Sequence, residues 1–292
     1  MSVQSPDSSA FSAAFKRAAV LYHPKIEASE PLAREIAAAL NQAGCDAWLA
    51  LTWDQDLILP RMDETGLIIV LGGDGSLLRA ARMSAAHPIP LLGVNMGRVG
   101  FLTEVSPDTW QEKLPRVLAG DYWLEDRLMI EATAWRGDEK LGEHLALNDV
   151  VISRGALARV VRLRTEIDNN YLTTYVADGL IVSTPTGSTA YAMAAGGPIL
   201  PPELRNILVL PIAPHLTLDR AIVLSEGAEV TVRLKTDHTA ILTVDGQTAV
   251  EMQNGDHVCV TTSSHKSRFI RLGKRTYFYD ALIERLAPKR DR

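Results

Sequence analysis

The sequence predicts an α/β N-terminal domain with a parallel, Rossmann-like sheet, followed by a β-rich C-terminal domain and a C-terminal helix returning to the first domain. Up to about residue 120, short apolar runs alternate with helical spacing, which is typical of a parallel sheet covered by helices. After about residue 127, alternating strands follow one another at short intervals. The expected boundaries are a loose tail at 1–16, an α/β domain at 17–126, a β-rich domain at 127–274 and the terminal helix at 275–292.

In the first domain, apolar runs predict buried strands at residues 18–22, 46–51, 66–71 and 90–95. Helices are predicted from Ser29 to Gly44, over 77–86 and over 107–120. For the first helix, Ser29 is the expected N-cap and Pro31 fits the first turn. Strand and helix therefore alternate along the chain.

In the second domain, strands are predicted at residues 128–135, 144–153, 160–167, 171–176, 179–184, 207–212, 228–235, 240–246, 257–262 and 268–272. The residues at 168–170 (DNN) and 245–246 (DG) indicate hairpin turns. One helix, at about 190–195, interrupts the strands. Helical spacing returns at 277–286.

Composition excludes several classes of protein. The 292 residues include 30 basic and 35 acidic side chains, a net charge of −5, which argues against a dedicated binder of nucleic acid or anionic membranes. Two unpaired cysteines, Cys45 and Cys259, argue against a disulfide scaffold or a thiolate zinc site. The sequence has no signal-like N-terminus and no apolar run near the ~20 residues of a membrane span. We therefore expect a cytoplasmic protein without nucleic-acid or membrane partners.

The first motif with chemical content is GGDGSLLRAAR at 72–82, directly after the strand at 66–71. Its glycines let the backbone approach a ligand, and the helix that follows offers free N–H groups to phosphate. It lacks both the third glycine of the dinucleotide fingerprint and the lysine of the Walker A loop. Asp74 would repel phosphate unless a metal bridges the two or the carboxylate does proton work. A tight turn with an Asp that caps the helix is the simpler alternative, and the whole motif favours function.

Other segments add polar groups near strand ends. Arg79 lies one turn into the helix after the loop, where it can reach phosphate or ribose; a solvated helix residue is the alternative. A second glycine-rich strand exit, GVNMGRVGFLTE at 93–104, is expected at the same edge of the sheet, where ligands of such folds bind. Asn148-Asp149 can hold a ribose diol or an amide, although a polar turn before a strand is the commoner meaning of this pair. The seven histidines form no metal-binding motif.

The segment DGLIVSTPTGSTAYAMAAGGPIL at 178–200 joins a strand to a small-residue helix through a loop of Gly, Ser and Thr. Hydroxyl groups at a helix start can bind phosphate or nucleoside groups. An ordinary Ser/Thr-rich connection is the alternative. Asp178, just before the strand, is placed to accept from an amino group.

Together, GGDGSLLRAAR, GRVGFLTE, LNDVVISRG and DGLIVSTPTGSTAYAMAAGGPIL resemble the bacterial NAD kinase family, over about residues 18–279. The resemblance implies an α/β domain followed by a β-rich domain, assembled as a homodimer or homotetramer. It implies phosphorylation of the adenosine-ribose 2′-hydroxyl of NAD to give NADP, with ATP or another triphosphate, in some members polyphosphate, as donor. It also implies a divalent metal cation, Mg²⁺ by expectation, held through the ATP phosphates.

The resemblance also assigns residues. Asp74 would be the general base. The nucleotide- and substrate-binding positions would be Gly73, Gly75, Arg79, Asn148, Asp149, Arg159, Asp178, Thr189, Ala190, Tyr191 and Gln247. The chain departs from the family at Asp149, where Glu is usual, at Val176, where several members have a basic residue, and at Ala194, where many have Ser.

Two other functions share part of this pattern. A lipid kinase of the diacylglycerol type shares the strand–GGDG loop and the β-rich second domain, but the STPTGSTAY segment and the absence of a basic or amphipathic membrane face count against it. A non-catalytic dinucleotide sensor would bind without turnover, and the intact Asp74 counts against it.

Overall fold

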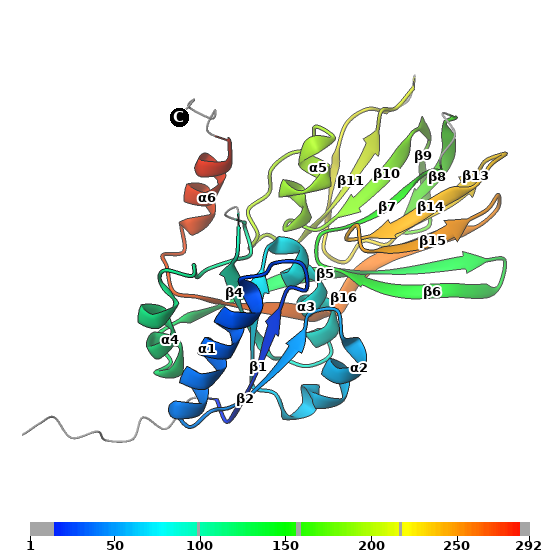
Figure 1. Ribbon diagram of the computed structural model, residues 1–292. Helices are drawn as coiled ribbons and strands as arrows, with labels where there is room; N and C mark the ends of the chain where they lie inside the picture. Colours follow the sequence, from blue (N-terminus) through cyan, green and yellow to red (C-terminus); the bar gives the residue numbers. More distant parts are fainter. Residues whose placement is uncertain (1–14, 98–99, 156–158, 216–217, 287–292) are drawn as a thin grey trace, which may run out of the picture. The chain divides into compact units, whose positions relative to one another are not determined.

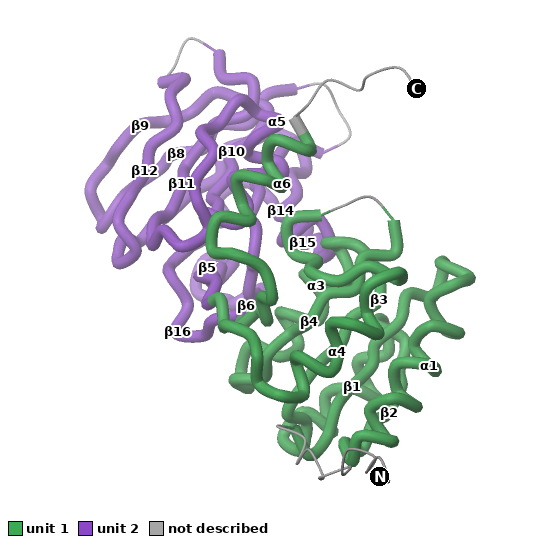
Figure 2. Tube along the Cα trace, turned by 90° about the vertical axis from the view of Figure 1, so that its left-hand side faces the viewer, with its two compact units in different colours: residues 1–125, 268–292 green, residues 126–267 purple. Residues whose placement is uncertain are grey.

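The computed structural model of the protein describes residues 15–97, 100–155, 159–215 and 218–286 (Figure 1). The predicted tail lies outside the described residues except for its last two, as do residues 98–99 of the second glycine-rich segment. The chain divides into two compact units, residues 1–125 with 268–292 and residues 126–267 (Figure 2). The predicted fold class is confirmed: an α/β unit with a parallel sheet, a β-rich unit, and a C-terminal helix.

The sheet of the α/β unit has the strand order β2–β1–β3–β4, with all neighbours parallel. The strands are β1 (Arg17–Tyr22), β2 (Asp46–Leu51), β3 (Leu67–Gly72) and β4 (Pro90–Asn95). Every residue of β3 is buried, as its continuous apolar sequence predicts for a central parallel strand. The end of the long strand β16 (His257–Arg271) adds to this sheet, because Arg268 and Phe269 pair in parallel with β4.

The helices of this unit are α1 (Ser29–Gln42), α2 (Gln55–Ile58), α3 (Asp74–Ser84), α4 (Trp110–Leu118) and α6 (Tyr277–Leu286). Helices α1 and α4 pack Ile36, Leu40, Leu114 and Val117 into one apolar core with β1, β3 and β4. The expectation that Ser29 is an N-cap is wrong. Its buried hydroxyl donates to the carbonyls of His23 and Ile26, at 2.7 Å each, instead of accepting from the helix. Helix α2 and the 3₁₀ turn after it, Leu59–Glu64, were not predicted because they are too short for a periodic signal.

The β-rich unit contains a six-stranded sheet of order β12–β11–β10–β7–β14–β15 and a second group in which β16, β13, β8 and β9 pair in turn. The strands of the first are β7 (Asp149–Arg154), β10 (Gly179–Ser183), β11 (Asn206–Ile212), β12 (Ile222–Ser225), β14 (Ala240–Val244) and β15 (Thr248–Met252). The second group contains β8 (Val161–Ile167), β9 (Asn170–Ala177) and β13 (Val230–Lys235), and β5 (Trp123–Arg136) pairs with β6 (Glu139–Ala146). Apolar side chains from both groups meet in one core.

Both predicted hairpin turns are confirmed by positive φ angles, +50° and +63° at Asp168 and Asn169, and +50° and +63° at Asp245 and Gly246. The predicted helix near 190–195 is the short α5 (Tyr191–Ala194), preceded by a 3₁₀ turn at Gly187–Thr189.

Two strand predictions were wrong in detail. The run at 144–153 is two strands, β6 and β7, because the chain bends at Leu147-Asn148. The runs at 257–262 and 268–272 are one strand, β16. Among the described residues, no helix is long and apolar enough to span a bilayer.

Candidate active site

Asp74 is the first residue of α3 and follows the carboxyl end of β3. Gly73 precedes it in an extended conformation, and its carbonyl accepts from the N–H groups of Ser76 and Leu77, at 3.0 and 3.3 Å. Asp74 is half-buried and Gly75 is exposed. The predicted strand–loop–helix context is therefore present, with the helix start at the strand end where phosphate groups bind in such folds.

The carboxylate of Asp74 is held by the second glycine-rich segment. Its two oxygens accept from the backbone N–H groups of Phe101, at 3.0 Å, and Leu102, at 3.1 Å. Gly100 lies so close that a Cβ there would be 1.9 Å from Oδ1 of Asp74, so only glycine fits. The alternative in which Asp74 caps α3 does not describe the structure, because the helix has no side-chain cap. Each oxygen keeps lone pairs beyond its one hydrogen bond, so the group can still accept a proton.

Arg79 lies one turn further along α3. Its guanidinium stacks on Trp53, 4.9 Å from the ring centroid, and Trp53 meets His23 edge-on with centroids 4.8 Å apart. Burial, and then the charge of Arg82, lower the pKa of Arg79, which remains a cation at neutral pH. Trp53 and His23 follow β2 and β1, so this cluster occupies the carboxyl edge of the sheet, as Asp74 does.

In the β-rich unit, Asp149 begins β7 directly after Asn148, and Asp245 holds the backbone of both residues. The Asp245 carboxylate accepts from the N–H groups of Leu147, Asn148 and Asp149, at 3.1, 2.8 and 3.2 Å. In return, the N–H of Asp245 donates to the carbonyl of Asp149 at 2.9 Å. Asp149 is 5% exposed, and burial together with the charge of Asp245 raises its pKa to about 7. Near neutral pH its carboxyl group can therefore both donate and accept hydrogen bonds.

The STPTGST loop packs against the same backbone. Thr184 donates from its hydroxyl to the Leu147 carbonyl at 2.5 Å, and Ser183 donates to the Asn148 carbonyl at 3.0 Å. A Cβ on Gly187 would lie 2.1 Å from the Asn148 carbonyl oxygen. This loop therefore contacts the backbone of Leu147 and Asn148, directly before β7.

Most of the predicted residues of this unit gather at this end of β7, β10 and β14. Thr189 is buried and ends the 3₁₀ turn, and Ala190 and the 47% exposed Tyr191 follow it. Gln247 lies in the β14–β15 turn, where its N–H donates to the Val244 carbonyl at 2.9 Å, two residues from Asp245. Because these loops follow strand ends beside the start of β7, we refer to the four residues together with Asn148-Asp149 as the Asn148 cluster.

Asp178 and Arg159 lie elsewhere. Asp178 precedes β10 and pairs with Arg154 at 2.9 Å, at the other end of β7. With about 3.3 Å per strand residue, that is roughly 15 Å from the STPTGST loop. Arg159 forms an exposed ion pair with Asp237 at 3.0 Å. Within one β-rich unit, these two side chains therefore do not join the Asn148 cluster.

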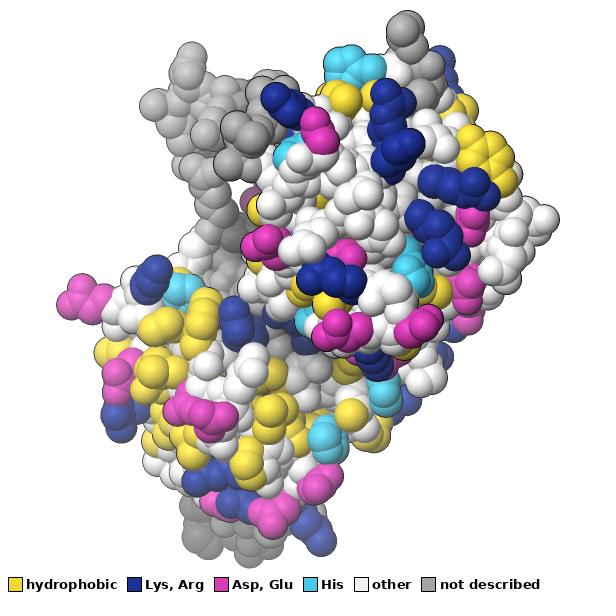
Figure 3. All heavy atoms as spheres, turned by 90° about the vertical axis from the view of Figure 1, so that its right-hand side faces the viewer, with side chains coloured by type: hydrophobic (Ala, Val, Ile, Leu, Met, Phe, Trp, Pro, Cys, Tyr) yellow, Lys and Arg dark blue, Asp and Glu magenta, His cyan; other side chains and the backbone are white. Residues whose placement is uncertain are grey.

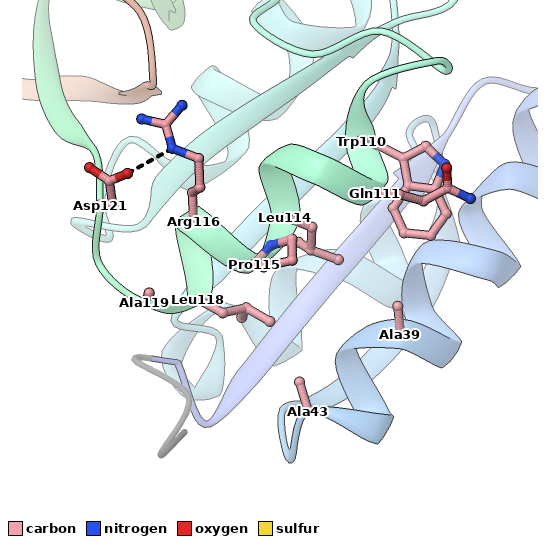
Figure 4. Close-up of a pocket in the computed structure, with 10 residues that line it drawn as sticks. All are labelled: Ala39, Ala43, Trp110, Gln111, Leu114, Pro115, Arg116, Leu118, Ala119 and Asp121. Carbon is pink, nitrogen blue, oxygen red and sulfur yellow. Dashed lines mark hydrogen bonds and ion pairs between the residues drawn. The ribbon is translucent and has the colours of Figure 1, made fainter. Parts of the chain in front are cut away.

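Two observations bear on other sites. Among residues 15–97, 100–155, 159–215 and 218–286, no group of three or more His, Cys, Asp or Glu side chains is placed to hold a metal ion. A hollow of about 560 Å³ lies between α1 and α4, where Ala39 and Ala43 face Leu114 and Leu118 (Figure 4). None of the predicted site residues lines it.

Charges of both signs are interspersed on the face shown in Figure 3, in keeping with the net charge of −5.

Comparison with known proteins identifies the class. Sequence models of the ATP-NAD kinase N-terminal domain and of the ATP-NAD kinase C-terminal domain match residues 16–122 and 147–272. The fold is that of the crystal structure of yeast NADH kinase complexed with NADH, with a TM-score of 0.81, 21% identity, and coverage of 95% of this chain and 89% of that one. An NAD kinase from Archaeoglobus fulgidus in complex with ATP has a TM-score of 0.76 at 26% identity, over 91% of this chain and 98% of that one. Fold and GGDG loop thus define a nucleotide-dependent phosphotransferase.

Relatives with higher sequence identity identify the family more narrowly. The chain is 43% identical to the NAD kinase of Chloroflexus aurantiacus, over 93% of this chain and 98% of the relative. It is 40% identical to the NAD kinase of Dehalococcoides mccartyi, over 93% and 96%. The chain belongs to the ATP-NAD kinase family, which confirms the resemblance seen in its motifs.

Sequence reasoning missed several contributors. The sequence marks Asp245 only as part of a hairpin turn, and His23 stands in no metal-binding motif. Trp53 carried no motif. The N–H groups of Phe101 and Leu102 are backbone atoms, so residue types do not reveal them, although the glycines of 93–104 did mark the segment.

Proposed function

We propose that this chain transfers a phosphoryl group from ATP to the 2′-hydroxyl of the adenosine ribose of NAD, giving NADP, with Asp74 as the general base. The carrying observation is the Asp74 carboxylate, held by two backbone N–H groups at the glycine-rich end of β3 in a chain of the ATP-NAD kinase family. The ATP of the Archaeoglobus fulgidus complex supports the choice of donor. Polyphosphate as an additional donor remains part of the proposal.

In this reaction the 2′-hydroxyl oxygen attacks the γ-phosphorus as its proton passes to Asp74, and the bond from the γ-phosphorus to the bridging oxygen breaks to release ADP. Phosphoryl transfer depends mainly on positioning and charge neutralisation. The Phe101 and Leu102 N–H groups fix Asp74 without using all of its lone pairs, which suits a proton acceptor. Gly73, Gly75 and Arg79 would bind the phosphates through backbone N–H groups and the guanidinium.

The Asn148 cluster would bind the dinucleotide. Asn148 and Asp149 would hold ribose hydroxyl or amide groups, since Asp149 with a pKa of about 7 can donate or accept near neutrality. Thr189, Ala190, Tyr191 and Gln247 would contact the nucleoside parts. The exposed ring of Tyr191 offers a stacking surface.

Family membership implies a divalent cation, and we propose Mg²⁺. Mg²⁺ is usually held by one or two carboxylates together with substrate phosphates, so the absence of a chelating cluster among the described residues is compatible with binding through ATP. Asp74 is the one carboxylate in the GGDGS loop at 72–76. The ion would neutralise charge on the triphosphate.

We also propose a homodimer or homotetramer in the cytoplasm. Two free cysteines, Cys45 and Cys259, fit a reducing compartment. Light scattering of the purified chain measures the assembly directly.

The test is a coupled assay for NADP formed from NAD, ATP and Mg²⁺, with EDTA and Asp74→Asn as controls. We expect metal-dependent NADP and a loss of about 10²- to 10⁴-fold in kcat for the folded variant. Near-native turnover by folded Asp74→Asn would remove Asp74 as the base. Saturable NAD binding without NADP would favour the sensor, and sedimentation with liposomes in the absence of NAD turnover would favour the lipid kinase.

A further inference from the structure

The backbone segment that binds the Asp74 carboxylate, Phe101–Leu102, is itself hydrogen-bonded to one buried side chain. Arg271, the last residue of β16, is completely buried, and it donates to the carbonyls of Phe101, at 3.1 Å, Leu102, at 3.2 Å, and Thr103, at 3.4 Å. Phe101 and Leu102 are the residues whose N–H groups bind Asp74. The Arg271 guanidinium and the Asp74 carboxylate are therefore hydrogen-bonded to the same short stretch of backbone.

One peptide group links the two directly. The carbonyl of Phe101 and the N–H of Leu102 belong to the same planar peptide and point in opposite directions. The carbonyl accepts from Arg271 and the N–H donates to Asp74. A rotation of this peptide would break both bonds together. A cation on the carbonyl also strengthens the N–H as a donor through polarisation.

The remaining N–H groups of Arg271 are also satisfied. Its Nε donates to Glu125 at 2.8 Å, one terminal nitrogen donates to the Tyr277 hydroxyl at 3.0 Å, and the other lies 3.4 Å from Glu104. Glu104 in turn accepts from the N–H groups of Leu272 and Gly273, at 2.9 Å each. The guanidinium is thus fixed in orientation on all sides.

Stability alone does not require this arrangement. Burying a cation is costly, and apolar replacements of buried ion pairs are often neutral or stabilising. The fork of a guanidinium reaches several acceptors in one plane, which an ammonium group cannot do. The backbone geometry that the buried arginine enforces therefore explains its presence better than a gain in stability does.

We propose that Arg271 is a positioning residue for the phosphoryl transfer: it fixes the Phe101–Thr103 backbone, which orients the Asp74 carboxylate. The inference rests on the proposed role of Asp74. It connects the start of α3 to a residue 197 positions further along the chain, after the entire β-rich unit.

The experiment compares Arg271→Lys with Lys113→Met as the matched control. Lys113 donates to the carbonyl of Glu104, at 2.9 Å, and so ties down the same segment beyond the residues that contact Asp74. We expect Arg271→Lys to lower kcat about 10- to 100-fold, with smaller changes in KM for NAD and ATP, because small misplacements of reacting groups have effects of this size. Lys113→Met should retain the wild-type kcat.

The decisive arm repeats Arg271→Lys in the Asp74→Asn background. A positioning role predicts no further loss of kcat there, whereas general structural damage predicts the same fold-loss as in the wild type. An equal loss in both backgrounds, or a wild-type kcat for Arg271→Lys, overturns the proposal. If Arg271→Lys does not fold, Tyr277→Phe removes one of its fixing partners, and we expect the same pattern at smaller size. A full effect in the Asp74→Asn background again overturns the proposal.

Hydrogen exchange separates this inference from the proposed function. The Phe101 and Leu102 amides should exchange at least about tenfold faster in Arg271→Lys, and unchanged in Lys113→Met, since exchange follows local opening. This readout needs no turnover. A wild-type chain that makes no NADP contradicts the proposed function, while unchanged exchange in Arg271→Lys contradicts the positioning role.

Discussion

At the scale of single residues, two carboxyl groups differ in their surroundings. Asp74 is half-buried and accepts from two backbone N–H groups. Asp149 is buried beside Asp245, and burial with that charge raises its pKa to about 7. Acids in different environments take different roles. We expect Asp74 to act on a proton and Asp149 to bind through a carboxyl group that is partly protonated at neutral pH.

Asp149 makes the stability of the protein depend on pH. A folded-state pKa of about 7, raised from 3.8, means that the folded chain keeps a proton that the unfolded chain has lost between about pH 4 and pH 7. The stabilisation is complete below the unfolded-state value and is lost as pH rises through 7. Asp149→Asn removes this titration. We expect its stability relative to the wild type to be greater at pH 8 than at pH 5 by roughly 2–3 kcal/mol.

Urea unfolding of both proteins at the two pH values measures this difference. A stability gap that is the same at pH 5 and pH 8 would show that Asp149 titrates normally in the folded state.

At the scale of elements, most of the proposed site residues lie at the ends of strands. In the α/β unit, the carboxyl ends of β1, β2 and β3 bring together His23, Trp53 and Asp74, because parallel strands end at one edge. In the β-rich unit, β7 pairs antiparallel with both β10 and β14. The start of β7, the end of β10 and the end of β14 therefore meet, and the loops that follow the last two carry Thr189 and Gln247.

The contact of the STPTGST loop with β7 gives a prediction for Gly187→Ala. The new methyl group would lie 2.1 Å from the Asn148 carbonyl oxygen, a backbone atom that cannot move away freely. We expect a loss of stability of about 1–3 kcal/mol and a raised KM for NAD. Gly227→Ala is the control, since a Cβ at this exposed glycine meets nothing within 4 Å.

Thermal unfolding and steady-state kinetics of the two variants test this. Equal melting temperatures and equal KM values for NAD in Gly187→Ala and Gly227→Ala would contradict this prediction. They would mean that the contact between the loop and β7 contributes neither to stability nor to NAD binding.

At the scale of the whole molecule, we expect the fold to form without a bound metal. Separate apolar cores support the two units, and the described residues contain no chelating cluster. We expect EDTA, without nucleotide present, to leave the melting temperature unchanged while it abolishes NADP formation, and excess Mg²⁺ to restore turnover. Differential scanning calorimetry with a parallel assay measures both. A melting temperature that falls with EDTA would indicate a resident structural ion.

The amino-acid sequence was enough to predict the fold class, most of the elements in their order and the segments proposed to carry the site. Apolar runs and helical spacing are local, so they mark β3 and α3, and positive-φ residue types mark the turns at 168–170 and 245–246. The glycines, Asp74 and Asn148-Asp149 stand in motifs whose residue types the chemistry requires.

Which distant groups contact these residues became visible only in the folded chain. In the sequence, Asp245 is only a turn residue and Arg271 is only an arginine at the end of a strand. In the structure, the pairing of β7 with β14 places the Asp245 carboxylate at the start of β7. Asp178 belongs to the same motif as Thr189, yet β10 carries them to opposite ends. Local patterns specify how a segment is built, whereas strand pairing, which joins residues such as Ala18 and Leu67 or Val151 and Thr243, specifies what lies next to it.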